Sequence, residues 1–114
     1  DYPASQSALA RIRDNADGGS VAARFELFVE GIELANGYHE LTDPDEQQRR
    51  LEADQHTRQL LSLPQRPLEQ RLVAALAFGL PDCAGVALGV DRLVMLALQA
   101  SHIKEVIPFT FRNA

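Results

Sequence analysis

The sequence is poor in the residues that build cross-linked or metal-held frameworks. Its 114 residues include one cysteine, Cys83, and no tryptophan. A single cysteine excludes a disulfide framework and a cysteine-ligated zinc site, and the three histidines lack metal-ligand spacing. No apolar run approaches the roughly 18 residues of a membrane span, and no secretory signal is recognisable. We therefore expect a cytoplasmic protein without a membrane partner.

Positive charge is also scarce, and lysine above all. Acidic residues outnumber basic ones 16 to 11, Lys104 is the single lysine, and the formal net charge is −5. This excess of negative charge argues against nonspecific electrostatic binding to nucleic acid over a broad surface. Hydrophobic residues make up 46% and charged residues 24%, which is typical of one soluble globular domain. The chain begins with Asp1 instead of methionine, so we interpret it as a piece of a longer protein.

Residues 24–41 alternate apolar and polar positions with the period of a β-strand. Glu30-Gly31 divides this segment at a tight turn, which predicts an antiparallel hairpin. Asn36-Gly37 interrupts the second strand, and both residues tolerate a positive φ. This dipeptide is either a second turn or a bulge.

Helical patterns follow the hairpin. Asp43 is the expected N-cap of a helix, Pro44 its first residue, and Glu46 the partner that completes a capping box. This helix is expected to run to about residue 61. It is polar on almost all sides, so we expect it to lie on the surface. An apolar stripe predicts a second helix from residue 68, ending at Gly79.

The C-terminal part adds two strands and one more helix to the expected elements. Residues 85–89 form a short buried strand, and residues 90–100 form a helix that is apolar on nearly all sides, which predicts that it is buried. Val106 and Ile107 form a final strand that Pro108 ends. Strands followed by helices indicate an α+β fold, with an antiparallel sheet flanked by helices.

Arg92 is unexpected at the start of a helix. Asp91 suits the positive end of the helix dipole, whereas Arg92 carries the opposite sign. Free backbone N–H groups beside a guanidinium form a site for phosphate. Gly89, where strand meets helix, permits a ligand to approach the backbone closely. The alternative is an internal network of Asp91 and Arg92 that only stabilises the helix start.

Glu33 and Glu40 are the candidate carboxylates of a site on the hairpin. They are seven residues apart, so they point to opposite faces of an unbroken strand. One extra residue at Asn36-Gly37 reverses that parity and brings both to one face. Two carboxylates on a sheet face suit Mg²⁺ on a nucleotide, or an amine. The alternative is a pair of ordinary solvent-facing glutamates.

These features, in this order, resemble the C-terminal half of the catalytic domain of class II aminoacyl-tRNA synthetases. GVALGVDRLVML resembles the glycine-rich strand, Gly-x-Asp-Arg and apolar helix of that family, and GIELANGYHEL resembles a segment of lysyl-tRNA synthetases. The resemblance covers about residues 24–108 and implies that residues 1–114 are the C-terminal portion of a single catalytic domain. PDCAGVALGVDRLVMLAL and the opening DYPASQ are most similar to truncated lysyl-tRNA synthetase paralogues that modify elongation factor P.

The resemblance implies an ATP-dependent ligase that activates (R)-β-lysine or lysine as an adenylate and passes it to a lysine of elongation factor P. Arg92 would be catalytic, stacking on adenine and reaching the γ-phosphate. Glu33, Leu34 and Gly89 would complete the ATP-binding set, and the metal-binding set, for Mg²⁺, would be Glu33 and Glu40.

The amino acid would face three residues, Asn36, Glu40 and Ala87. Lysyl-tRNA synthetases usually have glycine at the position of Ala87. The added methyl group would bias the pocket from α-lysine toward β-lysine, by about 1–3 kcal/mol.

The resemblance also implies motifs upstream of residue 1, one that forms a dimer and one that supplies an arginine for the α-phosphate. We therefore expect the parent to be a homodimer and this chain to be inactive alone. A true lysyl-tRNA synthetase and a non-catalytic synthetase-like module remain alternatives, and tRNA is not the expected acceptor.

Overall fold

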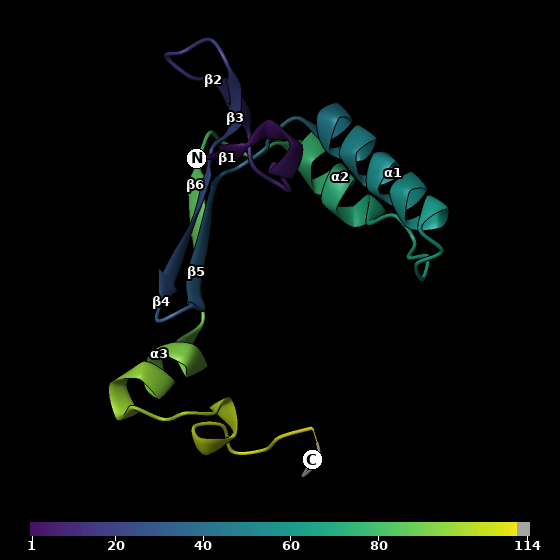
Figure 1. Cartoon of the computed structure of the whole chain (residues 1–114). Coiled ribbons are helices and arrows are strands. Elements are labelled where there is room, and N and C mark those ends of the chain that lie inside the picture. The colour runs from purple at the N-terminus through teal and green to yellow at the C-terminus, as the bar shows by residue number, and fades with distance from the viewer. Residues whose placement is uncertain (112–114) are drawn as a thin grey trace.

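A computed structural model describes residues 1–111 of the chain (Figure 1). Residues 1–111 form six strands and three α-helices, together with two 3-10 turns, η1 and η2. The mixture of antiparallel sheets and helices confirms the α+β class. The elements are β1 (Tyr2–Pro3), η1 (Ala4–Gln6), β2 (Ile12–Asp14), β3 (Ser20–Ala22), β4 (Arg24–Val29), β5 (Ile32–His39), α1 (Pro44–Leu60), α2 (Gln70–Phe78), β6 (Ala84–Leu88), α3 (Val90–Leu98) and η2 (Ile103–Glu105).

The main sheet has the strand order β4-β5-β6 and is antiparallel throughout. The expected hairpin is confirmed, because β4 and β5 pair on either side of Glu30-Gly31. Both turn residues have positive φ, 51° and 80°, which is the geometry of a tight two-residue hairpin turn. The second sheet, β1-β3-β2, is small and was not expected from the sequence. Its strands have two or three residues, too few to show an alternation.

The irregularity in the hairpin lies at Leu34, not at Asn36-Gly37. Leu27 pairs with Ala35 and Phe28 pairs with Glu33, so one extra residue of β5 lies between them. Asn36 and Gly37 pair regularly with β4 and with β6, and the expectation of a turn or bulge there is wrong. The carbonyl of Leu34 accepts a hydrogen bond from the N–H of Gly89 at 2.9 Å, a contact with a distant segment.

Helices α1 and α2 pack on each other beyond one end of the main sheet (Figure 1). The carboxylate of Asp43 caps α1 by accepting from the N–H groups of Asp45 and Glu46 at 2.9 and 3.1 Å. The capping box is not formed, because the Glu46 carboxylate accepts instead from Arg49 and Arg50. Helix α2 ends at Phe78, and Gly79, where the sequence predicts the end of the helix, is its C-cap with a φ of 124°.

Helix α3 leaves the opposite end of the sheet, so the helices lie at the ends of the sheet more than over its faces (Figure 1). The expectation that this helix is buried is wrong for the described residues, where Met95 is the buried residue of α3 and Leu98 is 67% exposed. Among residues 1–111, η2 and β5 contact this helix but leave most of its apolar side chains exposed. Val106 and Ile107 follow η2 in a turn and form no strand. Among residues 1–111, we find no helix with the length and apolar character to cross a membrane.

Candidate active site

One face of the main sheet carries four of the seven candidate site residues, namely Glu33, Asn36, Glu40 and Ala87. Strand register assigns the faces, because residues paired across neighbouring strands point to the same side. Glu26 pairs with Asn36, which pairs with Ala87, and Tyr38 pairs with Gly85. The bulge at Leu34 moves Glu33 to this side as well, opposite Phe28. We call this side the site face; its members are Arg24, Glu26, Phe28, Glu33, Asn36, Tyr38, Glu40, Gly85 and Ala87.

Glu40 lies at one end of the site face, where a glycine makes room for it. Its Oε1 would be 2.7 Å from a Cβ atom built on Gly85, a separation that real side chains do not adopt. Any other residue at position 85 would therefore displace the carboxylate. The site face thus has a negative charge at this end, next to the strand β6 that carries Ala87.

Glu33 and Arg92 lie at the other end of the site face. The guanidinium Nη1 of Arg92 donates to the backbone carbonyl of Glu33 at 2.5 Å, so the start of α3 is tied to β5. A Cβ on Gly89 would be 3.2 Å from Cδ of Arg92, a tight contact that the arginine side chain would have to relieve by shifting. Among the described residues Arg92 forms no ion pair with Asp91, and the internal network considered as an alternative is not formed.

The middle of the site face is polar on β5 and small on β6. The Nδ2 group of Asn36 donates to the hydroxyl of Tyr38 at 3.0 Å. Ala87 lies directly opposite Asn36, and its methyl group is exposed. A ligand that lies along this strand would meet the amide and the methyl together.

Three further polar residues on or beside the site face were missed by sequence reasoning. The carboxylate of Glu26 accepts from the hydroxyl of Tyr2 at 2.7 Å and from the guanidinium of Arg24. This bond to Glu26 is the main reason why the pKa of Tyr2 lies above its usual value. Arg24 lies over the ring of Tyr2, 4.5 Å from its centroid, and 5.3 Å from that of Tyr38. The alternation of β4 was a signal for the positions of Arg24 and Glu26, but Tyr2 comes from a distant strand.

The distance between the carboxylates of Glu33 and Glu40 decides whether one Mg²⁺ can bind to both. Glu33 and Glu40 are at opposite ends of β5, roughly 20 Å apart at about 3.3 Å per residue. One ion with ligand distances of about 2.1 Å cannot touch both. At this separation Glu33 and Glu40 would not share one ion, and the metal-binding set of Glu33 and Glu40 stays a prediction in which each carboxylate serves singly. Among residues 1–111, no three acidic, histidine or cysteine side chains gather as a metal site. Mg²⁺ fits such a face, because it is bound by one or two carboxylates plus substrate phosphates.

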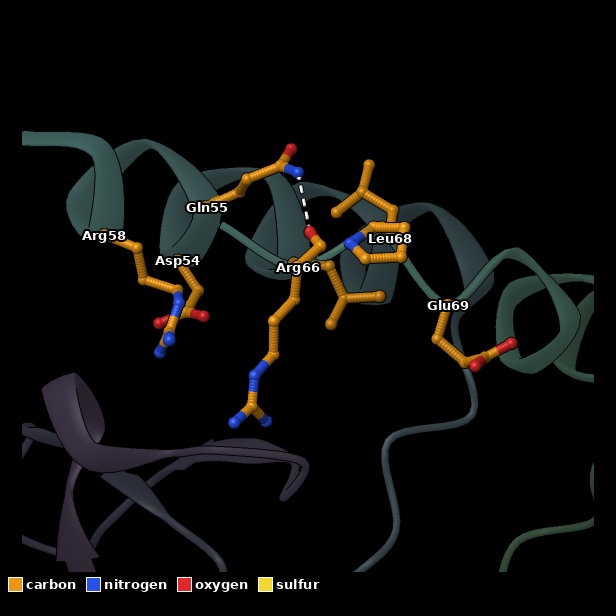
Figure 2. Close-up of a pocket in the computed structure, with 8 residues that line it drawn as sticks. Asp54, Gln55, Arg58, Arg66, Leu68 and Glu69 are labelled. Carbon is orange, nitrogen blue, oxygen red and sulfur yellow. Dashed lines mark hydrogen bonds between the residues drawn. The ribbon is translucent and has the colours of Figure 1, made fainter. Parts of the chain in front are cut away.

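A separate hollow of about 210 Å³ lies between α1 and the segment that leads into α2, away from the site face (Figure 2). Figure 2 shows the side chains of Arg58 and Arg66 extending on the same side of the helices. Arg58 donates to the carbonyl of Pro64 at 3.0 Å, and Gln55 to that of Arg66 at 2.9 Å. These bonds fix the loop that joins the helices, so the hollow is a structural gap between α1 and that loop.

Residues 1–113 match the model of the class II tRNA synthetases (D, K and N). The chain belongs to that family, and the fold expected from the resemblance is confirmed. It is 58% identical, over 113 residues, to proteins named elongation factor P--(R)-beta-lysine ligase from Salmonella paratyphi B (strain ATCC BAA-1250 / SPB7), Salmonella heidelberg (strain SL476) and Salmonella schwarzengrund (strain CVM19633). The match covers 99% of this chain but 34% of each relative, so the chain spans about a third of their length.

Proposed function

We propose that this chain is the part of an ATP-dependent ligase that binds ATP and the amino acid. The whole protein would activate (R)-β-lysine, or lysine, and attach it to a lysine of elongation factor P. The observation that carries the proposal is the 58% identity over 99% of the chain to proteins named for that reaction. The polarity of the site face supports it, with a guanidinium at one end and a carboxylate at the other.

The reaction has two steps. A carboxylate oxygen of the amino acid attacks the α-phosphorus of ATP, the bond to the β-phosphate oxygen breaks, and pyrophosphate leaves. The amine of the acceptor lysine then attacks the carbonyl carbon of the adenylate, AMP leaves, and the amine loses a proton. Both steps depend mainly on positioning and on stabilisation of phosphate charge.

The end of the site face near α3 would hold ATP. Arg92 would stack on adenine and neutralise the γ-phosphate, and Gly89 would let the nucleotide lie against the backbone. The carbonyl of Leu34 is bonded to Gly89, which holds the backbone of this residue beside the proposed nucleotide site. Glu33 would hold Mg²⁺, which neutralises phosphate charge when bound.

The other end would hold the amino acid. Glu40 would bind an ammonium group of the substrate, and Asn36 would orient the chain between the two groups. Ala87 would narrow the pocket opposite Asn36 and favour the β-amino acid. A homodimeric, cytoplasmic parent is part of the proposal.

Two other functions are weaker. A true lysyl-tRNA synthetase would take tRNA as acceptor, but the net charge of −5 gives this chain no broad basic surface. A non-catalytic module would not need to keep Glu33, Glu40 and Arg92, all of which this chain has.

The test is pyrophosphate exchange by a protein of the relatives' full length that carries this chain. Exchange that depends on (R)-β-lysine or lysine, followed by a mass increase of elongation factor P, is the expected result. Absence of exchange with either amino acid would favour the non-catalytic module. Exchange with lysine and transfer to tRNA would favour the synthetase.

A further inference from the structure

Asp82, in the segment that leads into β6, joins three parts of the chain. Its Oδ1 is 3.0 Å from Nη2 of Arg11, the residue just before β2, and 2.6 Å from Nε2 of His39, at the end of β5. These two partners are the cause of the lowered pKa of the Asp82 carboxyl, with His39 the larger contribution. We call Arg11, His39 and Asp82 the clamp.

The clamp surrounds the backbone of Glu40. Nε of Arg11 donates to the carbonyl of Glu40 at 3.2 Å, and Nη2 of the same residue donates to the hydroxyl of Thr42 at 2.8 Å. The N–H of Glu40 donates to the carbonyl of Cys83 at 3.0 Å, next to Asp82. Both backbone polar groups of Glu40 are therefore held by segments that the clamp ties together.

The same segment also positions the surface beneath the Glu40 carboxylate. Asp82 is three residues before Gly85, and Gly85 is the residue over which Oε1 of Glu40 lies. A movement of residues 82–85 would shift the Gly85 backbone against which the Glu40 carboxylate lies.

We propose that Arg11, His39 and Asp82 are positioning residues for the amino-acid end of the site, acting by fixing Glu40 relative to Gly85. This inference rests on the proposed function, because it assigns Glu40 to the ammonium group. A simple contribution to folding is a poor explanation of the clamp. Asp82 is 69% exposed, and ion pairs this exposed contribute only about 0–1 kcal/mol to stability.

The test compares the two Michaelis constants in pyrophosphate exchange, using a full-length protein that carries this chain. For Asp82→Asn we expect the KM for the amino acid to rise about five- to tenfold, because a small misplacement of a binding group weakens the productive complex. The KM for ATP should stay within about twofold, since Arg92 and Glu33 lie at the other end of the face. Arg49→Gln breaks an equally exposed ion pair with Glu46 on α1 and should change neither constant.

His39→Ala separates position from charge, because it removes one arm of the clamp and leaves the charge of Asp82. We expect it to raise the amino-acid KM as well, by less than Asp82→Asn does. If Asp82→Asn does not fold, the Michaelis constants of His39→Ala alone decide whether the clamp positions Glu40. Unchanged amino-acid KM in the folded variants, or an equal rise of both constants, would overturn the proposal. If the unmodified protein shows no exchange, the proposed function fails first, and that result is distinct from a failure of the clamp.

Discussion

At the scale of single residues, Arg92 offers the clearest separation of function from stability. Its side chain is exposed, and its one hydrogen bond among the described residues is to the Glu33 carbonyl. For Arg92→Ala we expect the KM for ATP to rise about tenfold or more, since charged hydrogen bonds contribute roughly 1.5–3 kcal/mol. The melting temperature should change little. An unaltered ATP requirement in exchange kinetics would refute the assignment, and Arg71→Ala, on α2, is the matched control.

Ala87 tests the selectivity of the pocket. Its methyl group is exposed on the site face opposite Asn36, so its removal opens space where the substrate is expected to lie. Ala87→Gly should raise the use of α-lysine relative to (R)-β-lysine, by a factor within the roughly 10–200-fold worth of one methyl or methylene group. The ratio of kcat/KM for the two amino acids measures the effect. An identical ratio before and after the substitution would show that Ala87 does not select the substrate.

At the scale of elements, α1 depends on a cap that the sequence correctly identifies. Asp43 accepts from two N–H groups in the first turn. Asp43→Ala should therefore destabilise the protein by about 1 kcal/mol in denaturant unfolding. Asp43→Asn is the control and should lose much less, because an amide oxygen also caps. Equal losses in the two variants would mean that the charge, and not the cap, stabilises α1.

The same helix should respond to acid through Glu46. Its pKa lies below the ordinary 4.5, first because of Arg50 and then because of Arg49. A carboxyl whose pKa is lower in the folded state stabilises fully above the unfolded value and loses that contribution as the pH falls through the folded one. We expect helicity to fall below about pH 4.5, and less steeply in Glu46→Gln. Circular dichroism across this range provides the check, and a variant with the same acid profile would contradict it.

Elements whose signals are local could be predicted from the sequence, and those that depend on distant contacts could not. The turn at Glu30-Gly31 and the cap at Asp43 need only a few neighbouring residues, and both are confirmed. The bulge was placed two residues too late, because its position at Leu34 accompanies a hydrogen bond to Gly89. The parity argument for Glu33 and Glu40 nevertheless holds, since one extra residue anywhere between them has the same effect. The Tyr2 contact with Glu26 spans two sheets and has no local signal.

At the scale of the whole molecule, the described chain is open. Its radius of gyration is 17.5 Å, whereas a compact domain of this length has about 13 Å. The face of the main sheet opposite the site face leaves Phe25, Leu27 and Val86 exposed by 49%, 47% and 62%. In a water-soluble monomer, an apolar surface of this kind marks a place of association. This chain spans about a third of the relatives' length, and its described residues therefore lack a closed core of their own.

This openness predicts how the 114-residue chain behaves by itself. With the apolar sheet face and α3 uncovered, we expect it to self-associate at micromolar concentration and to bind the dye ANS. We also expect no pyrophosphate exchange, because the site face is one uncovered wall and the substrates would remain solvated. A protein of the relatives' full length, measured beside it by sedimentation and fluorescence, should bind less dye per chain. A monomeric isolated chain that unfolds cooperatively without dye binding would contradict this expectation. It would also mean that the exposed face of Phe25, Leu27 and Val86 is compatible with an independent fold.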